Sequence, residues 1–206
     1  MSNHKWIDWA QRLQSIAQNG LTYSDNPFEI ERCHIIRKIA AEMLAENTSV
    51  AAKDFLDLFM DEAGYATPKL DIRGVVFEEN KILLVRELSD GGWTLPGGWV
   101  DINESPSQAV EREVWEETGY EVHANKLLAL YDRHKHGHPE YIFHLYKLYF
   151  RCEIIAGEPK DSHETEGAAF FAENEVPPLS IGRTTPEVLQ RMFYHMRNAD
   201  APTEFD

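Results

Sequence analysis

Three glutamates that follow one another closely are the residues best suited to chemistry in this chain. Glu113, Glu116 and Glu117 are spaced by three and four residues, which puts their side chains on one face of a helix. Like charges on one face repel, and each pair weakens a helix by roughly a few tenths of a kcal/mol. Hard divalent cations such as Mg²⁺ prefer carboxylate oxygens and would remove this repulsion. The spacing therefore predicts a metal site on a helix.

Glycines and an arginine accompany these carboxylates. The segment Leu95-Pro96-Gly97-Gly98 lets the backbone approach a metal closely, and the Gly98 carbonyl oxygen is a candidate ligand. Arg112 lies one turn before Glu116 and can reach back to Glu104, so we expect it to orient carboxylates by bidentate hydrogen bonds. The opposite side of the same helix is apolar and can pack against a sheet: Ala109, Val110 and Val114.

The whole segment from Gly98 to Tyr120 fits a longer pattern. It meets every fixed position of G-x5-E-x7-R-E-U-x-E-E-x-G-U, with Val114 and Tyr120 in the two apolar positions. A lone acidic string would indicate only a solvated helix face, but this full spacing resembles the Nudix box. That family hydrolyses nucleoside diphosphates linked to another moiety.

The resemblance implies a role for each charged position of the box, and it implies Mg²⁺ or Mn²⁺ as the cofactor. Glu113 and Glu117 are the expected metal ligands, and Glu116 shares ligand or base duty. Glu104 is expected to support Arg112 and to reach a metal at most through water. Because all three glutamates of the helix are present, a catalytic enzyme is favoured over a nucleotide-sensing Nudix domain, which needs no complete metal site.

The general base and the phosphate contacts are less fixed by the pattern. Glu164 and Glu166 lie in a charged loop where relatives often supply a carboxylate, and we favour Glu164. The alternative for both is a solvated acidic loop. Arg73 and Arg86 stand on the first two expected strands, where a cation can meet substrate phosphates or form a surface salt bridge.

Three histidines alternate with other residues further along the chain: His134, His136 and His138. On a strand, such alternation would put three imidazoles on one side and could bind a transition metal. Gly137 and Pro139 instead favour a loop that substrate reaches.

Residues 1–66 have a helical pattern and no cluster of metal ligands. Lys5–Gln18 predicts a first helix that stops at Asn19-Gly20, a second opens at Asn26-Pro27, and a third ends at Gly64. Three short helices bury little surface alone. We therefore predict a helical extension that contributes to a homodimer interface, with closure of one side of the substrate pocket as a second use.

Residues 67–206 have the pattern of one catalytic domain in which helices and strands are mixed. The expected elements are strands at 72–77, 82–85, 127–132 and 141–153, the box helix at 106–118 and a closing helix at 186–198. This order predicts an α+β fold. The resemblance implies the α/β/α sandwich of the Nudix domain, with a mixed sheet.

Composition narrows the setting and the partners. The formal net charge of −15 over 206 residues repels polyanions, so general nucleic-acid binding is not expected, although RNA ends remain open as a substrate. The two cysteines, Cys33 and Cys152, form no CxxC or Cys/His motif. No apolar run approaches the length of a membrane span. We expect a cytoplasmic protein whose partners are a small nucleotide conjugate and a second copy of itself.

A second, shorter resemblance concerns the substrate. The string from Leu13 to Tyr23 resembles the N-terminal extension of a bacterial Nudix subgroup described as ADP-ribose or CDP-alcohol pyrophosphatases. This implies CDP-choline, cut to CMP and phosphocholine, as the first substrate and ADP-ribose as the second. A nucleoside-triphosphate hydrolase or an RNA-end-processing enzyme is the alternative within the same chemistry.

Overall fold

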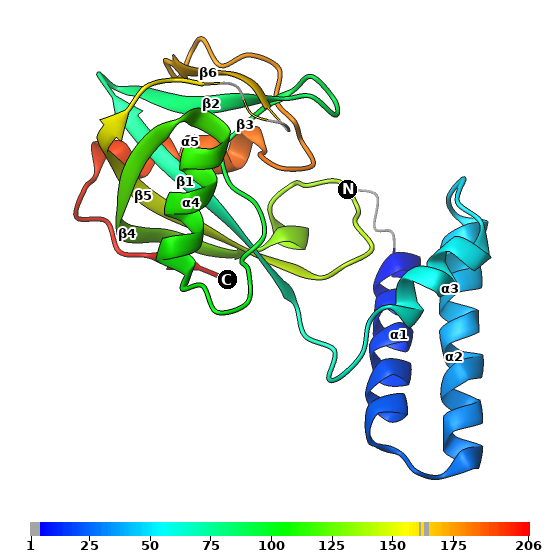
Figure 1. Cartoon of the computed structure of the whole chain (residues 1–206). Helices are drawn as coiled ribbons and strands as arrows, with labels where there is room; N and C mark the ends of the chain where they lie inside the picture. The colour runs from blue at the N-terminus through cyan, green and yellow to red at the C-terminus, as the bar shows by residue number, and fades with distance from the viewer. Residues whose placement is uncertain (1–4, 161, 163–164) are drawn as a thin grey trace. The chain divides into compact units, whose positions relative to one another are not determined.

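The computed structural model describes residues 5–160, 162 and 165–206, and the chain forms two compact units. Figure 1 shows the path of the chain through both. One unit is Met1–Pro68 with Glu140–His144, and the other is Lys69–Pro139 with Leu145–Asp206. Among the described helices, none is long and apolar enough to cross a membrane.

The first unit is a bundle of three helices, as predicted. They are α1 (Lys5–Tyr23), α2 (Pro27–Glu46) and α3 (Ala52–Met60), and Figure 1 shows α1 and α2 as an antiparallel pair. Their shared core is small: Ile7, Ala10, Ala40, Ala41, Leu44, Phe55 and Phe59. The segment 140–144 joins this unit through hydrogen bonds from Gln11 Nε2 to the carbonyl oxygens of Tyr141 at 2.9 Å and Ile142 at 3.1 Å.

The predicted helix stop at Asn19-Gly20 is wrong, because α1 continues to Tyr23. A Cβ atom added to Gly20 would clash with the Sγ atom of Cys33 on α2. The glycine therefore permits close packing between two helices instead of ending one. The third helix also ends earlier than predicted, at Met60, and Gly64 lies in the following turn with φ +80°.

The second unit is built on a seven-stranded mixed sheet. Its strands are β1 (Lys69–Glu78), β2 (Lys81–Glu87), β3 (Trp93–Thr94), β4 (Tyr120–Asp132), β5 (Leu145–Gly157), β6 (Thr165–Phe171) and β7 (Glu204–Phe205). The order is β3-β2-β1-β5-β4-β7, with β6 paired to β2. Strands β1 and β5 run parallel at its centre, while β4 and β5 run antiparallel.

Helices cover both faces of this sheet, which confirms the expected α/β/α arrangement. In Figure 1, α4 (Pro106–Thr118) crosses in front of the sheet and α5 (Pro186–Arg197) lies behind it. On the α4 side, Val110 and Val114 pack on Ile72 and Leu148. On the α5 side, Val188 and Met192 belong to a second core with strand residues of β1, β4 and β5. The box helix is thus fixed on the central strands.

Several strand boundaries differ from the predictions. Strand β4 begins at Tyr120, seven residues early, because its first half alternates exposed polar residues with buried or half-buried ones and carries no continuous apolar run. Strand β5 begins at Leu145 instead of 141, since residues 140–144 belong to the helical unit. The segment that forms β6 was expected to be a charged loop. Glu166 and Gly167 near its start interrupt the apolar residues by which a strand is recognised in sequence.

Candidate active site

The box helix begins and ends where the sequence predicts. Ser105 caps it: its hydroxyl accepts from Gln108 N at 3.3 Å, and the Gln108 side chain accepts from Ser105 N at 3.0 Å. Pro106 occupies the first turn. Gly119 ends the helix with φ +82°, a left-handed conformation that glycine adopts without strain. These boundaries decide which residues of the helix face the segment Leu95-Pro96-Gly97-Gly98, which we call the glycine loop.

Glu113 lies directly against the backbone of that loop. A Cβ atom added to Gly98 would be 3.0 Å from Glu113 Oε1 and 3.1 Å from its Cδ and Oε2 atoms. The space beside the carboxylate therefore exists because residue 98 has no side chain.

Glu117, one turn further on, is buried and held by the same loop. The Gly97 N–H donates to Glu117 Oε2 at 2.9 Å, and the residue is 7% exposed. Gly97 has φ +140°, and a Cβ atom there would clash with the Ile72 carbonyl oxygen. Two consecutive glycines are thus each required by a different close approach.

Strand β1 fixes the glycine loop from its other side. The Ile72 N–H donates to the Gly98 carbonyl oxygen at 2.9 Å, and the Gly74 N–H donates to the Pro96 carbonyl oxygen at 2.8 Å. A carbonyl oxygen has two lone pairs. The Gly98 oxygen therefore keeps acceptor capacity for a further ligand while the strand holds its direction.

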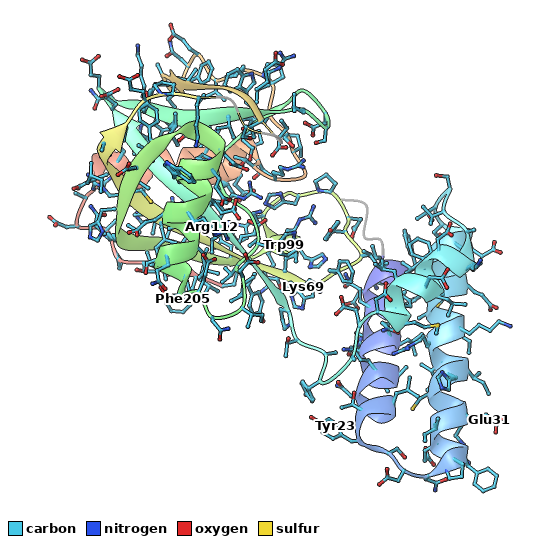
Figure 2. The ribbon with its side chains drawn as sticks, in the orientation of Figure 1. Tyr23, Glu31, Lys69, Trp99, Arg112 and Phe205 are labelled. Atoms are coloured by element: carbon cyan, nitrogen blue, oxygen red, sulfur yellow. The ribbon has the colours of Figure 1, made fainter. Side chains whose placement is uncertain are left out.

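Arg112, labelled in Figure 2, connects three carboxylates of the box. Its Nε and Nη2 atoms each donate to Glu104 at 2.9 Å, and its Nη1 atom donates to Glu113 at 2.8 Å and to Glu116 at 3.0 Å. The Trp99 carbonyl oxygen accepts a weaker bond of 3.4 Å. The guanidinium group is therefore fully used in holding carboxylates and backbone.

The surroundings of Glu113 and Glu117 favour the neutral, protonated form of each carboxyl group. Burial raises the pKa of Glu117 to about 8, against the lowering effects of Arg73 and the Gly97 N–H. Burial also raises the pKa of Glu113, and the charge of Glu116 adds to the effect. Glu104 shows the opposite behaviour, because its hydrogen bonds from Arg112 lower its pKa.

This arrangement fits a divalent cation. Two adjacent carboxylates have raised pKa values, which a positive ion would reverse. The Gly98 backbone lies close to Glu113, and the groups that could bind an ion there, the Glu113 and Glu117 carboxylates and the Gly98 carbonyl, all offer oxygen atoms. An all-oxygen site of this kind suits Mg²⁺ or Mn²⁺ better than softer metals.

Comparison with known proteins decides the family. Residues 67–192 match the family described as the NUDIX domain, and residues 4–59 match a UDP-X-like N-terminal oligomerisation domain. The chain belongs to the Nudix family. It is a Nudix pyrophosphohydrolase, and hydrolases of this family use a divalent metal ion.

Similar proteins have related names. A Bacillus subtilis protein, provisionally named an ADP-ribose pyrophosphatase, is 44% identical over 98% of this chain and 97% of its own length. A crystal structure of an ADP-ribose pyrophosphatase from Streptococcus suis is 40% identical, with a TM-score of 0.63, and covers 68% of this chain and 100% of that one. A crystal structure of a UDP-X diphosphatase is 28% identical, with a TM-score of 0.64 over 100% of both chains.

A further carboxylate, Glu87, lies near the Nudix box, and the sequence did not predict it as a site residue. Glu87, at the end of β2, is 5% exposed, and its charge contributes to the raised pKa of Glu117. Arg183 Nε pairs with Glu87 Oε1 at 2.7 Å. Only the distant pairing of β2 with β6 and the loop at Arg183 reveals this position, so no local motif signals it.

The two candidate phosphate contacts lie in different surroundings. Arg86 is half exposed; its Nε atom donates to the Gly91 carbonyl oxygen at 3.2 Å, and Glu166 lies 3.7 Å from its Nη1 atom. Arg73 is 4% exposed and donates two hydrogen bonds to Asp71. The candidate base Glu164 lies outside the described residues.

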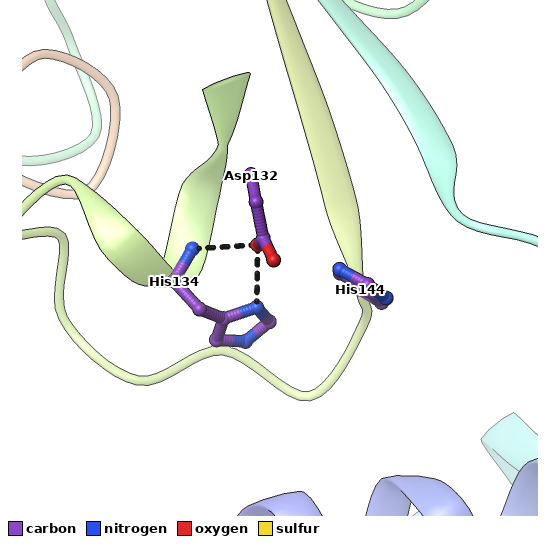
Figure 3. Close-up of side chains that lie close together, drawn as sticks. All are labelled: Asp132, His134 and His144. Atoms are coloured by element: carbon purple, nitrogen blue, oxygen red, sulfur yellow. Dashed lines mark hydrogen bonds and ion pairs between the residues drawn. The ribbon is translucent and has the colours of Figure 1, made fainter. Parts of the chain in front are cut away.

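The three alternating histidines of this Nudix unit have three different partners. The Asp132 side chain accepts a hydrogen bond from the His134 backbone N–H at 3.1 Å and lies 3.4 Å from its Nδ1 atom (Figure 3). His136 bonds to Asp206 and stacks on Tyr131, and His138 bonds to the Ile181 carbonyl oxygen. The alternation therefore does not place the imidazoles together.

Proposed function

We propose that the Nudix unit hydrolyses the pyrophosphate linkage of a nucleoside diphosphate joined to a second moiety. The observation that carries this proposal is the pair of carboxylates, Glu113 and Glu117, set against Gly98 and Gly97. A divalent ion held there would supply a bound water of lowered pKa and would neutralise charge on phosphoryl oxygens. Glu113 and Glu117 would hold the ion, with the Gly98 carbonyl oxygen as a further ligand.

The remaining residues of the box would serve these ligands. Arg112 and Glu104 orient the carboxylates, because the guanidinium group bridges both ends of the box. Glu116 is half exposed, and beyond its bond from Arg112 its carboxylate has oxygen lone pairs left to take a proton from water or to bind a second ion. We assign the substrate phosphates to Arg86, whose guanidinium is accessible.

For the substrate, we propose ADP-ribose first and CDP-choline second. A similar protein of matching length and a similar solved structure both bear names of ADP-ribose pyrophosphatases. CDP-choline rests on the resemblance of the first helix to a subgroup extension. Trp99, 45% exposed beside the glycine loop, is a candidate surface on which either base could stack.

A substrate panel tests this proposal directly. The full chain is incubated with ADP-ribose, CDP-choline, a UDP-sugar and a nucleoside triphosphate, each with Mg²⁺ or Mn²⁺, and products are identified by mass. We expect AMP and ribose 5-phosphate to form fastest. Faster formation of CMP would reverse the ranking, and no cleavage of any conjugate under either metal would refute the proposed activity.

We also propose that the helical unit joins two copies of the chain. On α1, Trp9, Ile16 and Tyr23 recur every seventh residue and are 51%, 58% and 70% exposed. Phe28 and Ile35 on α2 repeat this interval with 69% and 52% exposed. Such apolar stripes at heptad spacing are typical of helix pairing, and the match to an oligomerisation domain supports the same use.

A single charge placed in the stripe tests the homodimer. Ile16→Glu should shift the protein from dimer to monomer in light scattering, because burying a carboxylate at an interface is costly. Ile155→Glu is a matched control, since Ile155 is 67% exposed and lies on β5 of the Nudix unit. An Ile16→Glu protein with the parent mass would reject this interface.

A further inference from the structure

Three charged side chains are buried together beneath the glycine loop. Asp71 and Arg73 lie on β1 and Lys147 lies on β5, and they are 7%, 4% and 1% exposed. The parallel register places Asp71 opposite Lys147. Charged residues are almost never buried this deeply unless they are paired, so the group requires an explanation beyond folding.

Asp71 is the centre of this group. Its Oδ1 atom accepts from Lys147 Nζ at 2.6 Å and from Arg73 Nε at 2.9 Å, and its Oδ2 atom accepts from Arg73 Nη2 at 2.8 Å. Burial works to raise the pKa of Asp71, but the two cations and their hydrogen bonds hold it below its ordinary range. The bidentate pair leaves Arg73 with a fixed orientation.

In that orientation, the Arg73 side chain points toward the glycine loop. Its Nη1 atom donates to the Leu95 carbonyl oxygen at 3.1 Å. Leu95 opens the loop in which the Gly97 N–H holds Glu117 and the Gly98 backbone borders Glu113. Arg73 therefore fastens the loop two residues before the first glycine.

The positive charge of Arg73 also acts on Glu117. Burial raises the pKa of Glu117 to about 8, and Arg73 is the largest of the effects that oppose this rise. Removing one partner from a buried ion pair is strongly destabilising, because the other charge is left without compensation. Asp71 accepts hydrogen bonds from both cations of the group, so it holds Arg73 where it reaches the glycine loop and Glu117.

We propose that Asp71, Arg73 and Lys147 are positioning residues that hold the glycine loop and Glu117 in the geometry that binds the metal ion. Arg73 acts through the Leu95 carbonyl oxygen and through its charge, and Asp71 and Lys147 fix Arg73. This inference rests on the proposed metal-dependent function, and it gives Arg73 a role other than contact with substrate phosphates.

The test measures metal binding separately from catalysis in the full chain. The double variant Asp71→Asn/Lys147→Met removes one acidic and one basic side chain from the group and leaves Arg73 in place. We expect Mn²⁺ affinity, measured by calorimetry or by the spectrum of free Mn²⁺, to fall about tenfold. We expect kcat for the best substrate to fall by a similar factor, with KM within about twofold.

The control removes a different ion pair from the same unit. Glu204→Gln/Arg191→Met breaks the pair between β7 and α5, which lies outside the glycine loop. It should lower the melting temperature and leave Mn²⁺ affinity at the parent value. If the control weakened Mn²⁺ binding as much as the double variant, the effect would be general destabilisation and the proposal would be wrong.

A conservative variant covers the case in which the double variant does not fold. Arg73→Lys keeps the charge but cannot bind Asp71 in a bidentate manner and also reach Leu95. It should lose Mn²⁺ affinity, and a folded Arg73→Lys protein with parent affinity and parent kcat would overturn the proposal.

Failure of the positioning role can be told apart from failure of the proposed activity. If the parent cleaves no substrate but the variants still bind Mn²⁺ more weakly, the positioning role stands and the proposed activity fails. A parent that binds no Mn²⁺ would end both.

Discussion

Two arginines serve the same row of carboxylates, and they are held in opposite ways. Arg112 stands on the box helix itself, is partly exposed, and spends its donors directly on Glu104, Glu113 and Glu116. Arg73 rises from the buried centre of the sheet and reaches the site through the Leu95 carbonyl oxygen. In the proposed site, Arg112 would orient the metal ligands, and Arg73 would orient the backbone that those ligands face.

The difference shows how the sequence encodes two sets of contacts in the site. We call the contacts of Arg112 the first or local layer, and those of Arg73 the second or non-local layer. The contacts of Arg112 follow from residue spacing within one helix and its preceding loop, so they are local. The contacts of Arg73 depend on Asp71 and on Lys147, and Lys147 lies 76 positions after Asp71 in the chain. The first layer can be altered by one substitution, whereas the second also requires that charge remain balanced in the core.

The largest expected effect comes from Glu117, the buried carboxylate that the Gly97 N–H holds. Glu117→Gln should lower kcat by about 10²- to 10³-fold, because glutamine keeps the size and can still accept from the Gly97 N–H but lacks the charge a hard cation needs. Steady-state kinetics at saturating Mg²⁺ measure the loss, and circular dichroism checks the fold. Near-parent turnover at saturating Mg²⁺ would remove Glu117 from the metal site.

A smaller loss is expected from the outer arginine. Arg112→Lys should lower kcat about 10- to 100-fold and weaken Mg²⁺ activation, because an ammonium group cannot bridge Glu104, Glu113 and Glu116 at once. Arg197→Lys is the control, since Arg197 also pairs with a glutamate but at the end of α5. An Arg112→Lys enzyme equal to the parent in rate and metal activation would contradict the orienting role.

The sequence predicts the local layer well. The box helix has the predicted bounds because its signals are adjacent residues: Ser105-Pro106 at the start and Gly119 at the end. The helices of the first unit and the sandwich arrangement were also predicted, since amphipathic spacing and the family pattern carry them. Gly20 was misread because a glycine that admits a neighbouring helix looks the same in sequence as one that ends a helix.

The non-local layer could not be predicted in the same way. The sequence marked Arg73 as a cation on a strand, but the choice between substrate and a buried partner depends on the register of β1 against β5. Glu87 was missed for a similar reason, since its neighbours come from α4 and from the loop at Arg183. Strand pairing over long separations decides both positions, and no residue spacing reports it.

The glycine loop links the two layers, and a methyl group tests it. Gly98→Ala should lower kcat and Mn²⁺ affinity about tenfold, because the added carbon meets the Glu113 carboxylate at 3.0 to 3.1 Å and must displace it. Gly182→Ala is a matched control, since a Cβ atom there meets nothing within 4 Å. Parent-like metal binding in Gly98→Ala would show that Glu113 tolerates the displacement and is not a close ligand.

The smallest expected effect concerns the pH dependence of stability at His138, beside the buried group of Asp71, Arg73 and Lys147. Burial, together with the charges of Lys147 and Arg133, lowers the pKa of His138 to about 3, although the Ile181 carbonyl oxygen and Asp71 act to raise it. The unfolded chain, with an ordinary value of 6.5, therefore binds a proton in a range where the folded protein does not. Stability must fall as pH decreases from about 6.5 toward 3.

Because the imidazole is partly exposed, we expect a loss of about 1 kcal/mol between pH 7 and pH 5, less than full burial would give. His138→Gln removes the titration while an amide can still donate to the Ile181 carbonyl oxygen, so the variant should lose that much less over the same interval. Urea denaturation of both proteins at the two pH values measures the difference. Equal losses in parent and variant would mean that His138 is already charged in the folded protein, so that burial and the charges of Lys147 and Arg133 do not hold it neutral.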